Sequence, residues 1–343
     1  MKYREELIET AKAMVLAGKG ILAADESNPT CAKRFDLINV ESIEHNRRRY
    51  RNMLLTTEGL EKHISGVILF DETLRQSTLD GIRFPDYLIK KGILPGIKVD
   101  TGAKDLSLHE GEKITEGLDG LRDRLVEYRD LGAKFAKWRA VIKIGGSMPS
   151  DACIESNAHA LARYALLCQE QGIVPIVEPE VLMDGDHTIE ICYDVTSRAQ
   201  SALFRHLKLM GVFFGGVVLK PSMVTSGNNC VVQANIETVA SETVRCLLEN
   251  VPSEVPGVAF LSGGQSDELA TNHLNKMNEQ FKSKIPWSLT FSYGRALQHP
   301  ALMNWQGDDD NTLTAQKILL HRSYCNGLAS NGEYQPDVEP EMV

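Results

Sequence analysis

The sequence lacks closely spaced cysteines. Its seven cysteines are scattered, none forms a CxxC pair, and an odd number does not suit a closed disulfide framework. Reduced thiols in a cytoplasmic protein are therefore the simpler interpretation. The nine histidines show no grouped spacing typical of a metal site, so we expect no catalytic metal and disfavour a metal-dependent mechanism.

Long apolar runs and an excess of positive charge are also missing. No stretch approaches the roughly 18 uninterrupted apolar residues of a membrane span, and residues 1–6 are charged rather than apolar, so no secretory signal is expected. Lys and Arg number 37 against 46 Asp and Glu, which gives a net charge of -9. That balance argues against nonspecific binding to nucleic acid or to an anionic membrane.

No segment rich in Gly, Pro or Ser divides the chain, so we expect a single domain over residues 1–343. A chain of this length can bury a large core without disulfides or a metal. Residues 331–343 are polar and contain proline, and we expect them to form a mobile tail. Near the other end, apolar residues recur with helical spacing from Leu7 to Val15, which predicts an amphipathic helix over residues 3–17.

Eight short apolar runs make up most of the remaining pattern. Their starts lie roughly 30 to 46 residues apart, which leaves room for one helix and two loops between successive strands. The predicted strands cover residues 20–25, 66–70, 95–100, 135–139, 173–178, 216–220, 257–262 and 288–292. Intervals with a helical pattern include residues 150–171, 186–210, 236–250 and 268–281.

Near-continuous apolar strands that alternate with helices indicate a parallel sheet covered on both faces. Eight such units fit a closed (β/α)₈ (TIM) barrel. The alternative is an open, doubly wound sheet. We favour the barrel because polar residues end seven of the eight strands, and only a closed ring brings all of those ends to one place.

The polar groups at the predicted strand ends are those that a barrel enzyme would use. Alternation along a strand puts residues two apart on the same face, as for the pairs on the fourth and fifth strands. In strand order, the groups are Asp25, Lys98, Lys137 with Arg139, Glu178 with Glu180, Lys220, Ser262 with Gly263 and Gly264, and Ser292 with Gly294 and Arg295.

This mixture of charges suits a reactive site better than it suits stability, because buried charges are costly unless they are paired. A lysine crowded by other cations loses its proton more easily and becomes an amine nucleophile. A neighbouring carboxylate can move protons, and lysine or arginine can hold phosphates. The glycine-containing loops after the seventh and eighth strands lie where barrels frequently bind a phosphate.

Each of these residues also has an ordinary structural interpretation. Lys220 alone could extend to the surface, and the two glutamates of the fifth strand could be loop residues. The acidic cluster with His187 resembles a metal site, but a turn before a helix is the better interpretation. The basic run at residues 46–49 indicates a solvated helix face, although Arg47 could reach a phosphate. The coincidence of so many suitable groups at strand ends outweighs these separate interpretations.

The residues match a known family along most of the chain. The sequence resembles class I (Schiff-base) fructose-bisphosphate aldolase, and its Leu-Lys-Pro and Leu-Ser-Gly-Gly-Gln-Ser segments are the most specific motifs. The matching stretches are residues 18–27, 66–70, 96–100, 136–139, 176–180, 219–223, 260–266 and 291–297.

The resemblance implies catalytic roles for particular residues. Lys220 matches the lysine that forms the Schiff base with the substrate ketone. Glu178 matches the acid/base residue for carbinolamine formation and dehydration, and Lys137 matches the neighbour that supports this chemistry. Asp25 matches the residue that takes the proton of the C4 hydroxyl as the C3–C4 bond breaks. Glu180, together with Arg139, matches supporting members of the network.

The resemblance also implies two phosphate sites. Ser262, Gly263, Gly294 and Arg295 match the dihydroxyacetone-phosphate end, and Gly264 continues that loop. Ser27, Arg34 and Lys98 match residues near the other phosphate. Thr30 stands where the family often has serine, and Ser292 is expected to contact the substrate.

The family's reaction is the reversible cleavage of fructose 1,6-bisphosphate to dihydroxyacetone phosphate and glyceraldehyde 3-phosphate, in glycolysis and gluconeogenesis. A protonated imine takes up the negative charge left on carbon, so no metal or other cofactor is implied. The resemblance further implies a cytoplasmic homotetramer that acts on a phosphorylated ketose.

One departure from the family concerns a terminal tyrosine that favours the bisphosphate in many eukaryotic members. This chain ends in Val343, and the nearest matching tyrosine is Tyr334. Another group could take that role, or the preference over fructose 1-phosphate is weaker. Sedoheptulose 1,7-bisphosphate is an alternative main substrate. A catalytically idle binding scaffold is a third alternative, which the intact catalytic set disfavours.

Overall fold

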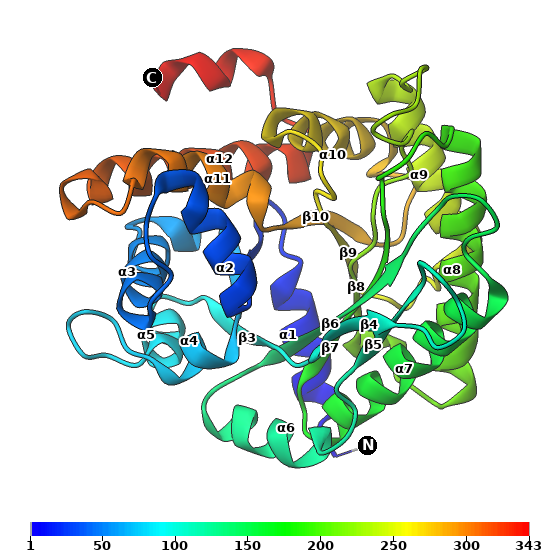
Figure 1. The fold of residues 1–343 in the computed structure, drawn as a ribbon, viewed down its shortest axis with the longest axis horizontal. Helices are drawn as coiled ribbons and strands as arrows, with labels where there is room; N and C mark the ends of the chain where they lie inside the picture. Colours follow the sequence, from blue (N-terminus) through cyan, green and yellow to red (C-terminus); the bar gives the residue numbers. More distant parts are fainter. Residues whose placement is uncertain (1, 343) are drawn as a thin grey trace.

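A computed structural model describes residues 2–342, and side chains up to Glu339. Its centre is a closed barrel of parallel strands in the order β1-β10-β9-β8-β7-β6-β3-β2, with helices around it (Figure 1). The predicted TIM barrel is therefore confirmed, and the open sheet is wrong. The barrel strands are β1 (Gly20–Ala24), β2 (Ile64–Leu69), β3 (Leu94–Lys98), β6 (Phe135–Ile142), β7 (Val174–Val181), β8 (Val218–Leu219), β9 (Gly257–Phe260) and β10 (Ser288–Tyr293).

The helices follow the predicted intervals closely. Three of them are capped at their amino-terminal end by a side-chain oxygen that accepts a hydrogen bond from a backbone N–H of the first turn. The capping residues are Ser150, Asn235 and Ser266. The helices are α1 (Arg4–Met14), α2 (Asn28–Phe35), α3 (Glu44–Leu55), α4 (Asp71–Arg75), α5 (Phe84–Lys90), α6 (Leu121–Asp130), α7 (Asp151–Glu170), α8 (Ile189–Leu209), α9 (Ile236–Asn250), α10 (Asp267–Phe281), α11 (Arg295–Trp305) and α12 (Thr312–Asn331).

Apolar residues alternate between the two faces of the barrel wall, as the period of a strand requires. On β1, Ile21 belongs to the cluster inside the barrel, whereas Leu22 belongs to the layer between strands and helices. Helix α1 contributes its apolar face to the inner cluster, through residues such as Leu7 and Met14. The Ser65 hydroxyl of β2 donates to the Met14 carbonyl at 2.6 Å and ties the end of α1 to the barrel. This helix therefore packs against the amino-terminal end of the barrel, opposite the carboxyl ends of the strands.

Three features differ from the sequence-based expectation. A hairpin of β4 (Gly102–Asp105) and β5 (Lys113–Glu116) follows β3, and its largely exposed, polar strands left no apolar run to detect. Strands β6 and β7 continue past their predicted ends, so Glu178 and Glu180, which were expected at the end of the fifth strand, lie within β7. Strand β8 is only two residues long.

The C-terminal segment was predicted to be mobile. Residues Pro336–Met342 form a short 3-10 helix, and mobility of the segment stays a prediction. Among the residues that the structure describes, no helix is both long and apolar enough to cross a membrane.

The packing inside the barrel predicts the effect of one methyl group. A Cβ atom at Gly96 on β3 would lie 2.2 Å from the ring of Phe135, which is fully buried. We expect Gly96→Ala to lower the free energy of unfolding by about 1–3 kcal/mol, because a packed core cannot absorb the added group. Urea unfolding measures this loss. Adding Phe135→Leu to the Gly96→Ala variant should recover part of it, and equal stability of Gly96→Ala and the parent would contradict the prediction.

Candidate active site

A cavity of about 500 Å³ lies at the carboxyl ends of the barrel strands. Every residue singled out from the sequence as catalytic or phosphate-binding lines it, so the barrel brings the whole predicted set together. The cavity is also lined by residues that sequence reasoning did not select, namely Ala23, Glu26, Leu182, Asp184, Asn228 and Leu261.

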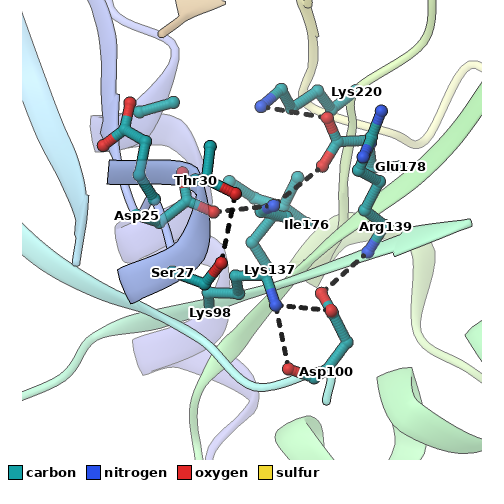
Figure 2. A network of polar contacts seen from close by, with 12 residues as sticks. Asp25, Ser27, Thr30, Lys98, Asp100, Lys137, Arg139, Ile176, Glu178 and Lys220 are labelled. Carbon is teal, nitrogen blue, oxygen red and sulfur yellow. Dashed lines mark hydrogen bonds and ion pairs between the residues drawn. The ribbon is translucent and has the colours of Figure 1, made fainter. Parts of the chain in front are cut away.

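Four charged side chains of alternating sign form the centre of the cavity (Figure 2). The Lys137 Nζ atom lies 2.7 Å from Asp25 Oδ2 and 3.3 Å from Glu178 Oε2. The second oxygen of Glu178 lies 3.1 Å from Lys220 Nζ. None of these four side chains is more than 12% exposed. Glu178 thus bridges the two lysines, and each of its oxygens faces one of them.

The strands fix where these groups stand. Lys137 comes from β6, and Glu178 lies opposite Arg139 in the adjoining ladder between β6 and β7. The Lys220 N–H donates to the Val177 carbonyl at 2.9 Å, as the last ladder bond of β8. Pro221 follows and has no N–H with which to continue the ladder, so Lys220 stands directly after the end of β8 at Leu219.

Burial and the neighbouring charges act in opposite directions on the titration of this cluster. Burial alone would raise the pKa of Asp25, but Lys137 and Lys220 hold that pKa below its ordinary value. Burial likewise would raise the pKa of Glu178, and the same two lysines lower it. For Lys137, burial would lower the pKa, yet Asp25 and Glu178 raise it. Both carboxylates are therefore ionised and Lys137 is protonated near neutral pH, so Lys137 is not the free amine.

This charge pattern corrects one expectation from the sequence. The nucleophilic lysine was expected to be crowded by cations, but the ionic partner of Lys220 is the carboxylate of Glu178. The cluster alternates in sign, which lowers the energy of burying four charges together.

A second group of charges surrounds Asp100, a residue that sequence reasoning did not select. Lys98 Nζ lies 2.5 Å from Asp100 Oδ1, and the Arg139 backbone N–H donates to Asp100 Oδ2 at 3.3 Å (Figure 2). The Arg139 side chain pairs with Glu180, one strand further along. The predicted supporting pair of Arg139 and Glu180 is thus in direct contact, and Asp100 fixes the lysine that faces the cavity.

Glu26 is a buried carboxylate beneath the cavity that was also missed. One of its oxygens lies 2.6 Å from Arg34 Nη1 and accepts a hydrogen bond from the Gln298 amide at 2.9 Å. Its other oxygen lies 2.7 Å from Arg51 Nη1. Two arginines thus share one carboxylate, so Arg34, Arg51 and Glu26 together carry a net positive charge. Arg34 is the member of this trio whose cation lines the cavity. The only sequence signal was the position of Glu26 directly after Asp25.

The basic run at residues 46–49 does not reach the cavity. Arg47 forms an ion pair with Glu72, with 2.6 Å between Arg47 Nη2 and Glu72 Oε2. The residue of helix α3 that acts near the site is Arg51, which is buried. Tyr334 also lies elsewhere, because it is buried against the C-terminal segment and its hydroxyl donates to Glu339 at 2.9 Å.

Two parts of the cavity wall are suited to phosphate. Helix α2 begins after Ser27, whose hydroxyl lies 3.1 Å from that of Thr30, so two hydroxyls stand at the amino-terminal end of a helix. On the other side, Gly263 and Gly264 have φ angles of 63° and 121°, which favour glycine and leave backbone N–H groups open to a ligand.

Close packing explains a third glycine of the cavity wall. A Cβ atom at Gly294 would lie 3.2 Å from the Ala23 carbonyl oxygen, so a side chain would press on the backbone of β1. The neighbouring Ser292 hydroxyl is buried and has no hydrogen-bond partner among the described residues, although Ser292 lines the cavity. Such a group is available to a bound substrate.

The fold and the cavity together define a barrel enzyme with a buried lysine, carboxylates at hydrogen-bonding distance and two anion-binding walls. This arrangement is suited to covalent lysine chemistry on a phosphorylated substrate.

Comparisons with known proteins give the family. The family model described as "Glycolytic: Fructose-bisphosphate aldolase class-I" matches residues 6–342. A protein of Xanthomonas campestris named probable fructose-bisphosphate aldolase class 1 is 57% identical over 96% of this chain and 99% of its own length. The chain belongs to the class-I fructose-bisphosphate aldolase family, so the resemblance inferred from the sequence is confirmed.

Proteins of a plant and of a parasite are also similar. Fructose-bisphosphate aldolase 4, cytosolic, of Arabidopsis thaliana is 52% identical over 97% of this chain and 85% of its own length. The solved structure of fructose-bisphosphate aldolase from Plasmodium falciparum, in complex with TRAP and a small-molecule inhibitor, superposes with a TM-score of 0.95. It is 48% identical and covers 97% of this chain and 96% of its own.

The charge cluster predicts how stability depends on pH. Because the pKa values of Asp25 and Glu178 are lowered, their contribution to stability is complete above the ordinary carboxyl range and is lost as the pH falls through it. Lys137→Met removes a cation that both carboxylates contact, so their folded-state pKa values rise toward the ordinary range. The variant should therefore be less stable than the parent near neutral pH and should lose less stability as the pH falls.

Urea unfolding between about pH 8 and about pH 4 measures this difference. Lys104→Met, at an exposed lysine of β4, is the matched control and should keep the parent's profile. Parallel profiles for the parent and Lys137→Met would show that Lys137 does not set the two pKa values.

Proposed function

We propose that this protein catalyses the reversible cleavage of fructose 1,6-bisphosphate to dihydroxyacetone phosphate and glyceraldehyde 3-phosphate, through a Schiff base on Lys220. The reaction serves glycolysis and gluconeogenesis. The observation that carries the proposal is the contact of 3.1 Å between Lys220 Nζ and Glu178 Oε1, in a cavity where Glu178 also contacts Lys137. Membership of the class-I aldolase family supports it.

The first stage forms the Schiff base. Glu178, held ionised by the two lysines, takes a proton from the Lys220 ammonium, and the resulting amine attacks the C2 ketone of the substrate. The carbinolamine forms when the proton on nitrogen passes to the former ketone oxygen. Glu178 then returns its proton to the carbinolamine hydroxyl, which leaves as water, and a protonated imine remains. Lys137 stays cationic beside Glu178 and stabilises the oxygen as charge develops on it.

The second stage breaks the C3–C4 bond. Asp25 accepts the proton of the C4 hydroxyl. It can do so because its lowered pKa keeps the carboxylate ionised before the reaction. The bond electrons move into the protonated imine and form an enamine, while the C4 carbonyl forms and glyceraldehyde 3-phosphate departs. Protonation of the enamine at C3 and hydrolysis of the imine release dihydroxyacetone phosphate and restore Lys220. The ion pair of 2.7 Å with Lys137 holds Asp25 in place.

The two walls of the cavity divide the phosphates between them. We assign the dihydroxyacetone-phosphate end to the loops that follow β9 and β10, supported by the glycine φ angles and by the open Ser292 hydroxyl. We assign the other phosphate to the start of α2 and the cations beside it. The first set is Ser262, Gly263, Gly264, Ser292, Gly294 and Arg295, and the second is Ser27, Thr30, Arg34 and Lys98.

The protonated imine takes the place of a metal, so the mechanism needs no cofactor. We infer a cytoplasmic location, since several relatives are named cytosolic aldolases. A homotetramer that acts on a phosphorylated ketose, without nucleic-acid or membrane partners, is the assembly that the family resemblance implies.

Trapping identifies the nucleophile directly. Borohydride reduction in the presence of dihydroxyacetone phosphate should attach the substrate to Lys220, and peptide mass spectrometry locates the adduct. Lys220→Met should show neither adduct nor turnover while keeping its fold, and Glu178→Gln should lose about 10²- to 10⁴-fold in kcat. Lys143→Met, at an exposed lysine, is the control. An adduct on Lys98 or Lys137 would mean that the assigned nucleophile is wrong, and no adduct would favour a scaffold role.

Removal of metal tests the chemistry separately. Because the imine stabilises the developing carbanion, activity after treatment with EDTA and desalting should equal that of the untreated enzyme. Added ZnCl₂ or MgCl₂ should not raise it. Loss of turnover on chelation, with recovery on addition of a metal, would contradict the Schiff-base mechanism.

A further inference from the structure

A group of potential metal ligands lies outside the catalytic cavity. His321 and Cys325 are one turn apart on α12, and the C-terminal 3-10 helix brings Glu339 against them. One ligand atom from each residue lies within 4.8 Å of the others. None of the three lines the catalytic cavity, and the proposed mechanism uses none of them.

The two distances from the His321 imidazole match those around a tetrahedral ion. His321 Nε2 lies 3.5 Å from Cys325 Sγ and 3.4 Å from Glu339 Oε2. Bonds from zinc of about 2.3 Å to sulfur and about 2.0–2.2 Å to nitrogen or oxygen place tetrahedral ligand atoms about 3.4–3.6 Å apart. Both distances from His321 Nε2 are therefore those that a shared ion would require, and all three ligand atoms lie within 4.8 Å of one another.

The carboxylate is already oriented for this role. Glu339 Oε1 is held by the Arg322 guanidinium and by the Tyr334 hydroxyl at 2.9 Å, and this leaves Oε2 directed at His321. Arg322 is fixed in turn on α10, since its Nη2 atom donates to Thr271 Oγ1 at 2.7 Å. Hydrogen bonds that hold a ligating carboxylate from behind are characteristic of protein metal sites.

We propose that His321, Cys325 and Glu339 bind a zinc ion or a similar borderline transition-metal ion, with water as the fourth ligand. Thiolate, imidazole and carboxylate together suit Zn²⁺ or Co²⁺ better than Mg²⁺ or Ca²⁺, which prefer oxygen ligands only. On coordination the Cys325 thiol releases its proton to solvent. The ion would join the C-terminal segment to α12, and this role is separate from the aldol reaction.

Metal titration of the full chain tests the site. After removal of bound metal with EDTA, calorimetric titration with ZnCl₂ should show one ion per chain, and titration with CoCl₂ should give a thiolate-to-cobalt charge-transfer absorption. Cys325→Ser and His321→Ala should abolish both signals. Tyr334→Phe keeps all three ligands but frees Glu339 from one partner, so affinity should fall about tenfold.

Two controls keep the result specific. Cys230→Ser changes a partly exposed cysteine elsewhere, and His109→Ala changes a partly exposed histidine. Both variants should bind metal like the parent. His321 is partly exposed and serine is close to cysteine in size, so both test variants should fold, which circular dichroism verifies. Absence of a bound ion in the parent, or unchanged binding in Cys325→Ser and His321→Ala, would overturn the proposal.

Discussion

The site depends on the two contacts of the Glu178 carboxylate, one to Lys137 and the other to Lys220. A carboxylate or an ammonium group removed from water is strongly destabilising unless a partner of opposite charge lies beside it. Each member of the series Asp25, Lys137, Glu178 and Lys220 has such a partner, and the series begins and ends with groups of opposite sign. Removing one member would leave a neighbour buried without its partner, so the cluster behaves as a unit.

The barrel makes this series possible. Strands β6, β7 and β8 are neighbours, and closure of the ring through β10 brings β1 to the same opening. The long strands β6 and β7 carry their charged residues partway along the wall, whereas the short strand β8 ends at Leu219, directly before Lys220. The apolar interior and α1 fill the opposite end of the barrel, which leaves the charges open to a substrate from one side only.

A second layer of charges holds the first in position. Asp100 fixes Lys98 and the backbone of Arg139, and Glu26 fixes Arg34 while the buried Arg51 balances its charge. The positive groups that face the cavity are therefore already oriented before a phosphate arrives. Such preorganisation is what reduces the free-energy cost of ordering side chains on binding.

The sequence alone determined the repeating pattern of eight strands, the reactive residues that end them and the family to which they belong. A periodic apolar run indicates which residues of a segment are buried, whatever the rest of the chain does. A motif such as Leu-Ser-Gly-Gly-Gln-Ser indicates a function that requires those residues in that order. For this reason the barrel and many of the residues that line its cavity could be predicted without coordinates.

Only the tertiary structure decided which charged groups touch. The exposed β4–β5 hairpin left no apolar run, and nothing in the sequence singled out Arg51, which the fold places against Glu26. Glu339 likewise meets His321 and Cys325 only because the C-terminal 3-10 helix packs against α12. Ion pairs between residues distant in sequence have no periodic signal, since closure of the barrel and the path of the loops determine which side chains meet.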